Sequence, residues 1–356
     1  MSAALDADPG PRAVAALAAA EEMVAAGRVL DAVEALHEAN GVERDAAIEI
    51  RLAELRYRAF SEVPEASRHA TWPVRVDAAA ADPTGPDDAA GAPGLARVAP
   101  ADLDADSVRR GILTRGAVHV PGLIDAATVD TLVEGIEHVL AVREANQDTP
   151  HKTLSSWFRG LPLPREEAIA LARPWIAGDG GVLACDSPRL LDLVLRTYER
   201  VGLRRVVEDY LGERPVLSAN KATLRRARLE GKSDWHQDGA FMGTGIRALN
   251  VWVALTDCGV DAPGMDLVPK RFETVQETGT GGAIFDWAVG PDTVATLAAD
   301  APVVRPRFAA GDVVLFDDLC LHRTAIDPAM TRPRHAVESW FFARTGYPTG
   351  QTPLVW

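Results

Sequence analysis

The sequence predicts a mainly β protein, an antiparallel sandwich or jelly roll, with a helical extension at its N-terminus. Three observations lead to this fold class. Residues 11–62 are dense in Ala, Leu, Glu and Arg, which favour helix. After residue 217 the chain consists mostly of short runs in which apolar and polar residues alternate, as they do in half-buried strands. Gly, Asp and Pro separate these runs, which is typical of antiparallel sandwiches.

The N-terminal extension, residues 1–70, is predicted to contain a pair of helices. Residues 11–40 form the first helical run, Asn40-Gly41 predicts a turn, and residues 43–60 form the second run. No second copy follows at a fixed period, so a repeat array is not expected. We interpret the pair as a packing extension or as the contact of a homodimer.

Residues 71–100 are rich in Pro, Gly, Ala and Asp and have no apolar period, which predicts a linker or a strap along the surface. The main domain is then 101–356. It opens with helix, short strand and helix, and Asp125 is a candidate N-cap of the second helix. Further on, Trp157 lies in a segment broken by Pro and Gly. It is either part of a lid, with His151, or part of an apolar plug.

Three later runs are predicted strands: 247–257, 311–322 and 334–343. The first alternates most clearly, so its residues divide between two faces. One face carries Leu249, Val251, Val253 and Leu255, and the other carries Asn250, Trp252 and Ala254.

Composition excludes several classes of protein. The formal charge of −14, without a run rich in Lys and Arg, argues against a nucleic-acid partner. The three cysteines are far apart and odd in number, which indicates neither a disulfide framework nor a zinc knuckle and fits a reducing compartment. A signal peptide is not expected, and no apolar run approaches the roughly 20 residues that cross a bilayer. We expect a soluble cytoplasmic protein without a membrane partner.

A candidate metal motif lies in "WHQDG". On a strand, His236 and Asp238 would project from the same face and supply two thirds of a 2-His-1-carboxylate site. Four histidines precede the strand region, and His151 belongs to the candidate lid. Of the two that follow, His335 points opposite to Arg334, whereas His322 ends a predicted strand, 86 residues after His236. His322 is therefore the predicted third ligand.

A basic residue is the second test of this motif. Oxygenases with such a triad use a 2-oxo dicarboxylate to reduce dioxygen, and the planar fork of arginine suits the far carboxylate. The segment "TRPRHAVESW" offers Arg332 and Arg334.

From about residue 116 to residue 342 the chain resembles the phytanoyl-CoA dioxygenase-like family of iron(II)/2-oxoglutarate oxygenases. The segments that carry the resemblance are, in order, "GAVHVPGLID", "WHQDG", "NVWVAL", "GDVVLFDDLCLH" and "RPRHA". The resemblance implies a double-stranded β-helix, or jelly roll, with helices supporting one sheet. Its iron ligands match His236, Asp238 and His322. Its 2-oxoglutarate residues match Arg334, Thr324 and Trp252.

Two departures accompany the resemblance. The family usually has a "PGSH"-like turn after the "NVWVAL" strand, where this chain has "APGMDLVPKRF", so the substrate is not carried over. Arg334 also lies one residue farther from His322 than is usual, and Arg332 one residue nearer. An insertion within "TAIDPAMT" favours Arg334, with Arg332 as the alternative.

The implied activity couples oxidation of 2-oxoglutarate to succinate with hydroxylation of an unactivated C–H bond of a small molecule. Natural-product tailoring and small-metabolite hydroxylation are both open. Asp238 argues against a halogenase, in which a small residue replaces the carboxylate. Two alternatives are a non-catalytic jelly-roll binding module and an oxygen-independent, metal-dependent cupin isomerase or lyase, which would not need Arg334.

Substrate contacts are predicted on the strand before the metal motif. Lys221, Thr223 and Arg225 share one face in "NKATLRRAR", and this cationic strip either holds an anionic substrate group or forms a solvated strand edge. Trp157 is a further candidate for a contact above the substrate.

Overall fold

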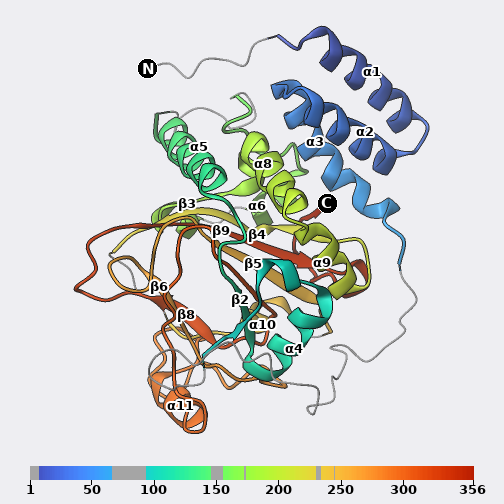
Figure 1. The fold of residues 1–356 in the computed structure, drawn as a ribbon. Helices are drawn as coiled ribbons and strands as arrows, with labels where there is room; N and C mark the ends of the chain where they lie inside the picture. The colour runs from blue at the N-terminus through green and yellow to red at the C-terminus, as the bar shows by residue number, and fades with distance from the viewer. Residues whose placement is uncertain (1–7, 66–93, 146–154, 172–173, 230–233, 244) are drawn as a thin grey trace.

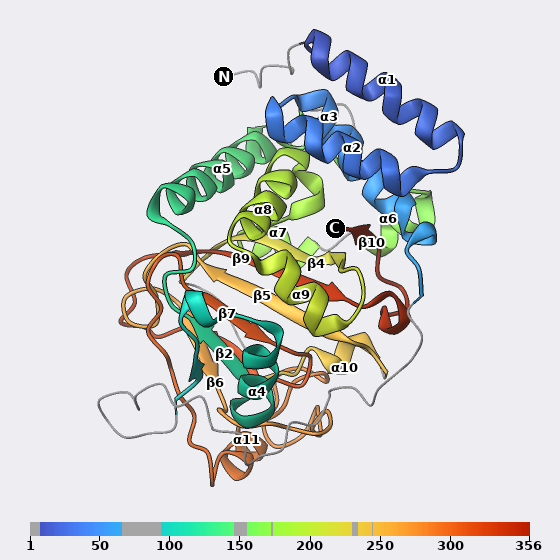
Figure 2. The same cartoon turned by 45° about the vertical axis from the view of Figure 1, so that its right-hand side comes forward.

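A computed structural model describes residues 8–65, 94–145, 155–171, 174–229, 234–243 and 245–356. In this part of the chain, helices cover one face of a large sheet, and a small sheet with long connections lies on the other face (Figures 1 and 2). The helices are α1 (Pro11–Ala25), α2 (Val29–Val42), α3 (Ala46–Arg58), α4 (Ala105–Arg115), α5 (Ala126–Ala145), α6 (Arg165–Leu171), α7 (Pro174–Gly178), α8 (Pro188–Arg200), α9 (Leu203–Leu211), α10 (Gly239–Met242) and α11 (Pro291–Leu297).

The strands are β1 (Ala96–Arg97), β2 (Ala117–Val120), β3 (Gly181–Leu183), β4 (Val216–Ala227), β5 (Ala248–Ala254), β6 (Gly264–Leu267), β7 (Val313–Phe316), β8 (His322–Ala325), β9 (Arg334–Phe342) and β10 (Pro353–Val355). Among the described residues, the large sheet has the order β1-β2-β7-β5-β9-β4-β10, with β3 beside β4. Its pairs are antiparallel except β1 with β2. The small sheet pairs β6 with β8. Two facing sheets with supporting helices confirm the predicted jelly roll.

Strand β5 shows how the large sheet separates the apolar core from the interior between the sheets. Leu249, Val251 and Val253 pack into the core beneath the helices. Trp252 and Ala254 face the other way, into the interior cluster. The alternation predicted for this run is confirmed, because successive side chains of a strand point to opposite faces.

The N-terminal region contains three helices where the sequence predicts a pair. The chain breaks at Gly27, whose φ of 72° is a conformation that favours glycine, so α1 ends before it. The predicted turn at Asn40-Gly41 lies inside α2. That turn prediction was wrong because Asn40 is buried, and its amide donates to Asp192 of α8 over 2.8 Å.

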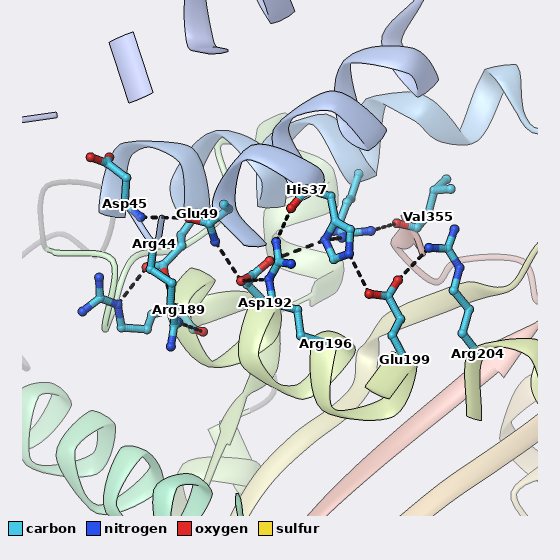
Figure 3. A network of polar contacts seen from close by, with 12 residues as sticks. His37, Arg44, Asp45, Glu49, Arg189, Asp192, Arg196, Glu199, Arg204 and Val355 are labelled. Carbon is cyan, nitrogen blue, oxygen red and sulfur yellow. Dashed lines mark hydrogen bonds and ion pairs between the residues drawn. The ribbon is translucent and has the colours of Figure 1, made fainter. Parts of the chain in front are cut away.

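Helix α8 joins the N-terminal helices to the sheet, since it has an apolar side and a charged side. Leu191, Val194 and Tyr198 pack into the core against the sheet. Asp192 and Glu199 face the N-terminal helices in a network of ion pairs (Figure 3).

His37 of α2 lies at the centre of that network. Its Nε2 is 2.7 Å from Glu199 Oε2, and its Nδ1 is 3.7 Å from Asp192 Oδ1. The guanidinium of Arg196 donates to Asp192 over 2.7 Å, and buried Arg56 donates to the carbonyl of Val355 in β10 over 2.8 Å. The extension therefore packs against its own chain. The homodimer contact stays a prediction.

We expect this network to make the stability of the chain depend on pH. Burial raises the pKa of Asp192, but the nearby imidazole of His37 and the hydrogen bond from Arg196 outweigh it and lower that pKa to about 2. A carboxylate with a depressed folded-state pKa contributes its full stability above its usual pKa of about 3.9. The contribution is lost as the pH falls toward 2.

Asp192→Asn should therefore cost about 1.5 kcal/mol at pH 7, the lower end for hydrogen bonds to a charged group, because asparagine keeps part of the contacts. Urea unfolding between pH 7 and pH 3 measures this cost, and the loss of stability on acidification should be smaller in the variant. Asp31→Asn removes an exposed ion pair with Arg28 and is the matched control. Equal pH profiles for wild type and Asp192→Asn would contradict the expectation.

Two predicted boundaries need correction. The end of the predicted linker forms structure, because Ala96–Arg97 pair with β2. Residues 66–93, which include most of that linker, lie outside the described residues. His322 begins β8 and does not end the preceding strand, because β7 stops at Phe316 and the side chain of Asp317 accepts from the amide of Leu319.

Asp125 is confirmed as an N-cap, since its side chain accepts from the amide of Thr128 over 2.9 Å. None of the helices in the described ranges has the length and apolar character needed to cross a membrane.

Candidate active site

The metal motif has a different backbone from the predicted one. The backbones of His236 and His322 form an isolated antiparallel β-bridge, with N–O distances of 3.0 and 3.1 Å. Asp238 is not in a strand, because its φ and ψ of −62° and −24° are helical and α10 starts after it. The prediction that both residues share a strand face was therefore wrong. The turn is held by Gln237, whose side-chain amide donates to the carbonyl of Leu319 over 2.7 Å.

The three predicted ligands nevertheless converge. The ligand atoms of His236, Asp238 and His322 all lie within 4.8 Å of one another. His236 Nδ1 is 3.0 Å from the carbonyl of Asp234, and His322 Nδ1 is 3.0 Å from the carbonyl of Cys320. Since a carbonyl only accepts, each Nδ1 carries the proton and each Nε2 keeps its lone pair.

The carboxylate completes the donor set. Asp238 is buried, and its Oδ2 has no hydrogen-bond partner within the described ranges, although it lies 3.7 Å from His322 Nε2. A buried carboxylate oxygen without a partner is costly unless a cation binds it. Lys221 of β4 holds the other oxygen, Oδ1, over 2.9 Å. A cation that bridges the two imidazoles and Oδ2 would satisfy all three groups.

The charges of the site suit a divalent metal at neutral pH. Burial, and then the nearby imidazole of His322, lower the pKa of His236 to about 4, so this ring is neutral. Burial by itself raises the pKa of Asp238, but the ammonium of Lys221 and the two imidazoles outweigh it and lower that pKa to about 2. A neutral imidazole and an ionised carboxylate are the forms that bind metal.

A cavity of about 900 Å³ opens beside these residues, between the two sheets. Arg334 of β9 lines it and is buried, and its guanidinium lies 5.3 Å from the ring centre of Trp252. Arg334 Nη1 donates to the carbonyl of Gly264 over 2.9 Å, whereas Nε has no partner in the described part of the chain. Burial lowers the pKa of Arg334 to about 10, so the group remains charged at pH 7.

The alternatives to the predicted residues lie elsewhere. Arg332 is exposed and 3.8 Å from Asp261. His335 points away from the metal motif and contacts Glu137 of α5 over 2.5 Å. Thr324, by contrast, lines the cavity together with Arg334. The structure thus brings the predicted ligands and cosubstrate residues to one site.

Of the three predicted substrate residues on β4, two line the cavity and one does not. Lys221 and Arg225 line the cavity, but Lys221 is paired with Asp238. Thr223 donates to Glu338 on the neighbouring strand over 3.1 Å.

Trp157 does not line the cavity. Its ring packs 4.4 Å from that of His138 and 5.2 Å from the guanidinium of Arg189, so it joins α5 to α8. His151, the other candidate for the lid, lies outside the described residues.

Three aromatic residues at the cavity were not predicted from the sequence. Phe241, Phe285 and Trp287 line the cavity, and the ring of Trp287 packs against each of the other two. The signal was present in "TGTGGAIFDW", where a glycine-rich turn carries two aromatic residues close together. Nothing in that segment alone shows that it lies beside His236.

Fold and site together define a jelly-roll protein with a 2-His-1-carboxylate donor set, the arrangement typical of non-haem iron oxygenases. The family model of phytanoyl-CoA dioxygenase (PhyH) matches residues 113–326, more than half of the chain. The chain belongs to this family and is an enzyme of the iron/2-oxoglutarate superfamily, which confirms the family predicted from the sequence. Membership of this family implies iron and 2-oxoglutarate, the predicted cofactors.

Several solved structures are similar to the chain. EctD from S. alaskensis with 2-oxoglutarate and 5-hydroxyectoine is 17% identical, with a TM-score of 0.48 over 71% of this chain and 82% of that one. The carbocyclase SnoK from nogalamycin biosynthesis is 19% identical, with a TM-score of 0.45 over 69% and 87%. EvdO2 from Micromonospora carbonacea var. aurantiaca complexed with 2-oxoglutarate is 16% identical, with a TM-score of 0.43 over 70% and 91%.

No curated protein matches the sequence. Likeness at this level of identity does not indicate a shared substrate.

Proposed function

We propose that the chain hydroxylates a C–H bond of a small molecule, with His236, Asp238 and His322 as ligands of one iron(II). The observation that supports this most directly is the convergence of their donor atoms within 4.8 Å. Each histidine Nδ1 faces a carbonyl, and Asp238 Oδ2 has no other partner in the described residues. A 2-His-1-carboxylate donor set would leave open positions on the iron for 2-oxoglutarate and dioxygen.

Arg334 is the proposed clamp for the far carboxylate of 2-oxoglutarate. The contact with Gly264 fixes one edge of the guanidinium, and the ring of Trp252 lies beside it. Within the part of the chain that the structure describes, the Nε–H has no partner and can donate to a carboxylate. A fixed, planar donor pair binds a carboxylate with little loss of entropy. Thr324, which lines the same cavity, is the proposed hydroxyl support.

When bound, iron(II) and 2-oxoglutarate activate dioxygen for attack on a C–H bond. The residues of this chain orient that chemistry. Lys221 holds Asp238 Oδ1 and so leaves Oδ2 as the ligand atom. Phe316 lies edge-on to His322, with ring centres 4.9 Å apart, and shields that ligand from water. Asp238 would supply the carboxylate ligand that a halogenase lacks.

Oxygen uptake tests this function. Iron(II) and 2-oxoglutarate are first bound to the full chain in the absence of oxygen. Oxygen and a panel of small molecules are then admitted, and oxygen uptake and succinate are measured. We expect both to require iron, and a converted substrate to gain one oxygen atom by mass spectrometry. A product of ring closure, epimerisation or loss of two hydrogens would still support an iron/2-oxoglutarate oxygenase, but it would contradict the proposed hydroxylation.

The same measurements separate the two alternatives. A binding module would bind neither iron nor 2-oxoglutarate. A cupin isomerase or lyase would bind metal and convert its substrate without consuming oxygen.

A further inference from the structure

An aromatic rim, made of Phe241, Phe285 and Trp287, borders the cavity next to the metal ligands. Their exposed fractions are 41%, 38% and 38%, which is high for large apolar side chains. Phe285 and Trp287 stack with an angle of 5° between their planes and centres 4.9 Å apart. Trp287 and Phe241 lie 5.8 and 6.0 Å from the ring of His236. Clustered exposed aromatics beside a site mark a binding surface for an apolar group.

The loop that carries two of these residues is tied to the metal motif. The amide of Ile284 donates to the carboxylate of Asp234 over 2.7 Å, and the amide of Val289 donates to the carbonyl of Trp235 over 2.8 Å. Asp234 and Trp235 immediately precede His236. The aromatic rim is therefore held in a fixed relation to the proposed iron ligands.

Lys221 restricts the charge that the aromatic rim can accept. Its ammonium lies 4.8 Å from the ring centre of Phe241, the place where a cationic ligand would bind to that ring. A cationic substrate would have to displace Lys221 from that ring, and the like charge of Lys221 would repel it. The aromatic rim therefore favours a neutral or anionic ligand.

Arg225 provides a second charge on the cavity wall. Within the described residues its guanidinium has no hydrogen bond or ion pair, and its Nε is buried. Arg226, the next residue, points to the opposite face and pairs with Glu137 over 2.7 Å. Arg228 also lines the cavity and is exposed. A guanidinium with a buried donor and no partner is poised to receive an anion.

One face of β4 connects the aromatic rim to Arg225. Lys221, which contacts Phe241, and Arg225 are four residues apart on β4, or about 13 Å at the rise of a strand. One molecule of modest length can contact both, since long side chains shorten that gap. The cavity of about 900 Å³ is near the upper end of the volumes of small-molecule sites, which leaves room beside the cosubstrate.

We infer that the substrate is an amphiphilic anion: a planar or cyclic apolar body that packs on the aromatic rim, joined to a carboxylate, sulfonate or phosphate that binds Arg225. The inference rests on the proposed function, because it names the substrate class of that same cavity. It concerns binding alone and adds no chemical step.

Calorimetric titration with three matched probes tests the inference. The full chain is saturated with iron(II) and 2-oxoglutarate in the absence of oxygen, so that the clamp at Arg334 is occupied. The probes are 2-naphthoate, which has a ring and an anion, 2-naphthamide, which has the ring alone, and propionate, which has the anion alone. We expect 2-naphthoate to bind at least about tenfold more tightly than either of the other two.

Two variants and two controls locate the contacts. Arg225→Met should weaken 2-naphthoate about tenfold to the level of 2-naphthamide, whereas Arg226→Met, on the outer face, should not. Trp287→Leu should weaken both ring probes, whereas Trp157→Leu, remote from the cavity, should weaken neither.

The outcomes distinguish this inference from the proposed function. Equal affinities of wild type for 2-naphthoate and 2-naphthamide, or no effect of Trp287→Leu, would overturn it. So would an Arg225→Met variant that weakens 2-oxoglutarate but not 2-naphthoate, because Arg225 would then belong to the cosubstrate. Failure of iron and 2-oxoglutarate to bind would overturn the proposed function instead, and the naphthoate titration of the metal-free chain would judge the substrate class separately.

Discussion

His322→Ala should abolish iron(II) binding and turnover together. A site with three protein ligands has no spare donor, and the loss should exceed the ten- to hundred-fold that mutation of an outer partner of a ligand costs. His322 lies beside His236, with ring centres 4.4 Å apart, so its replacement leaves only one imidazole near Asp238. Anaerobic titration with iron(II), followed by assay of oxygen uptake, measures both effects.

His335→Ala is the matched control for that change. His335 is a strand histidine that contacts Glu137 outside the cavity, so iron binding should remain as in wild type. If His335→Ala lost iron while His322→Ala retained it, the proposed ligand set would be wrong. Circular dichroism of both variants shows whether either change acts through unfolding.

Arg334→Lys should raise the dissociation constant of 2-oxoglutarate about ten- to hundred-fold. Lysine keeps the charge but loses the planar fork, and a hydrogen bond to a charged group contributes about 1.5–3 kcal/mol, where 1.4 kcal/mol is a factor of ten. Iron binding should change little, because Arg334 is not a proposed ligand. The charge-transfer absorption of the anaerobic complex of iron(II) and 2-oxoglutarate measures this affinity.

Arg332→Lys is the control for the clamp, since Arg332 is exposed and pairs with Asp261. Weaker binding in Arg332→Lys but not in Arg334→Lys would move the clamp to Arg332. An unchanged affinity in both variants would count against 2-oxoglutarate itself and would favour a metal-binding jelly roll without this cosubstrate.

The parts of the site that the sequence predicted depend on local periodicity and on residue chemistry. The two faces of β5 follow from period two, because one face must pack on the helices and the other must face the interior. Residue type and position at a strand end predict His322, whereas residue type and the family's local pattern predict Arg334, and the structure places both at the cavity. The local conformation of Asp238 was missed, since it depends on contacts of Gln237 with Leu319 and Gln276.

Residue type and spacing were sufficient to predict the fold class, the family and the residues that converge. Which charged groups lack a partner depends instead on how distant segments pack. Arg225 and Arg226 are adjacent and chemically identical, yet one faces the cavity without a described partner and the other pairs with Glu137 of α5. The aromatic rim likewise depends on a loop that meets the metal motif across about fifty residues of sequence. Contacts between distant segments are set by packing of the whole chain, which local pattern does not encode.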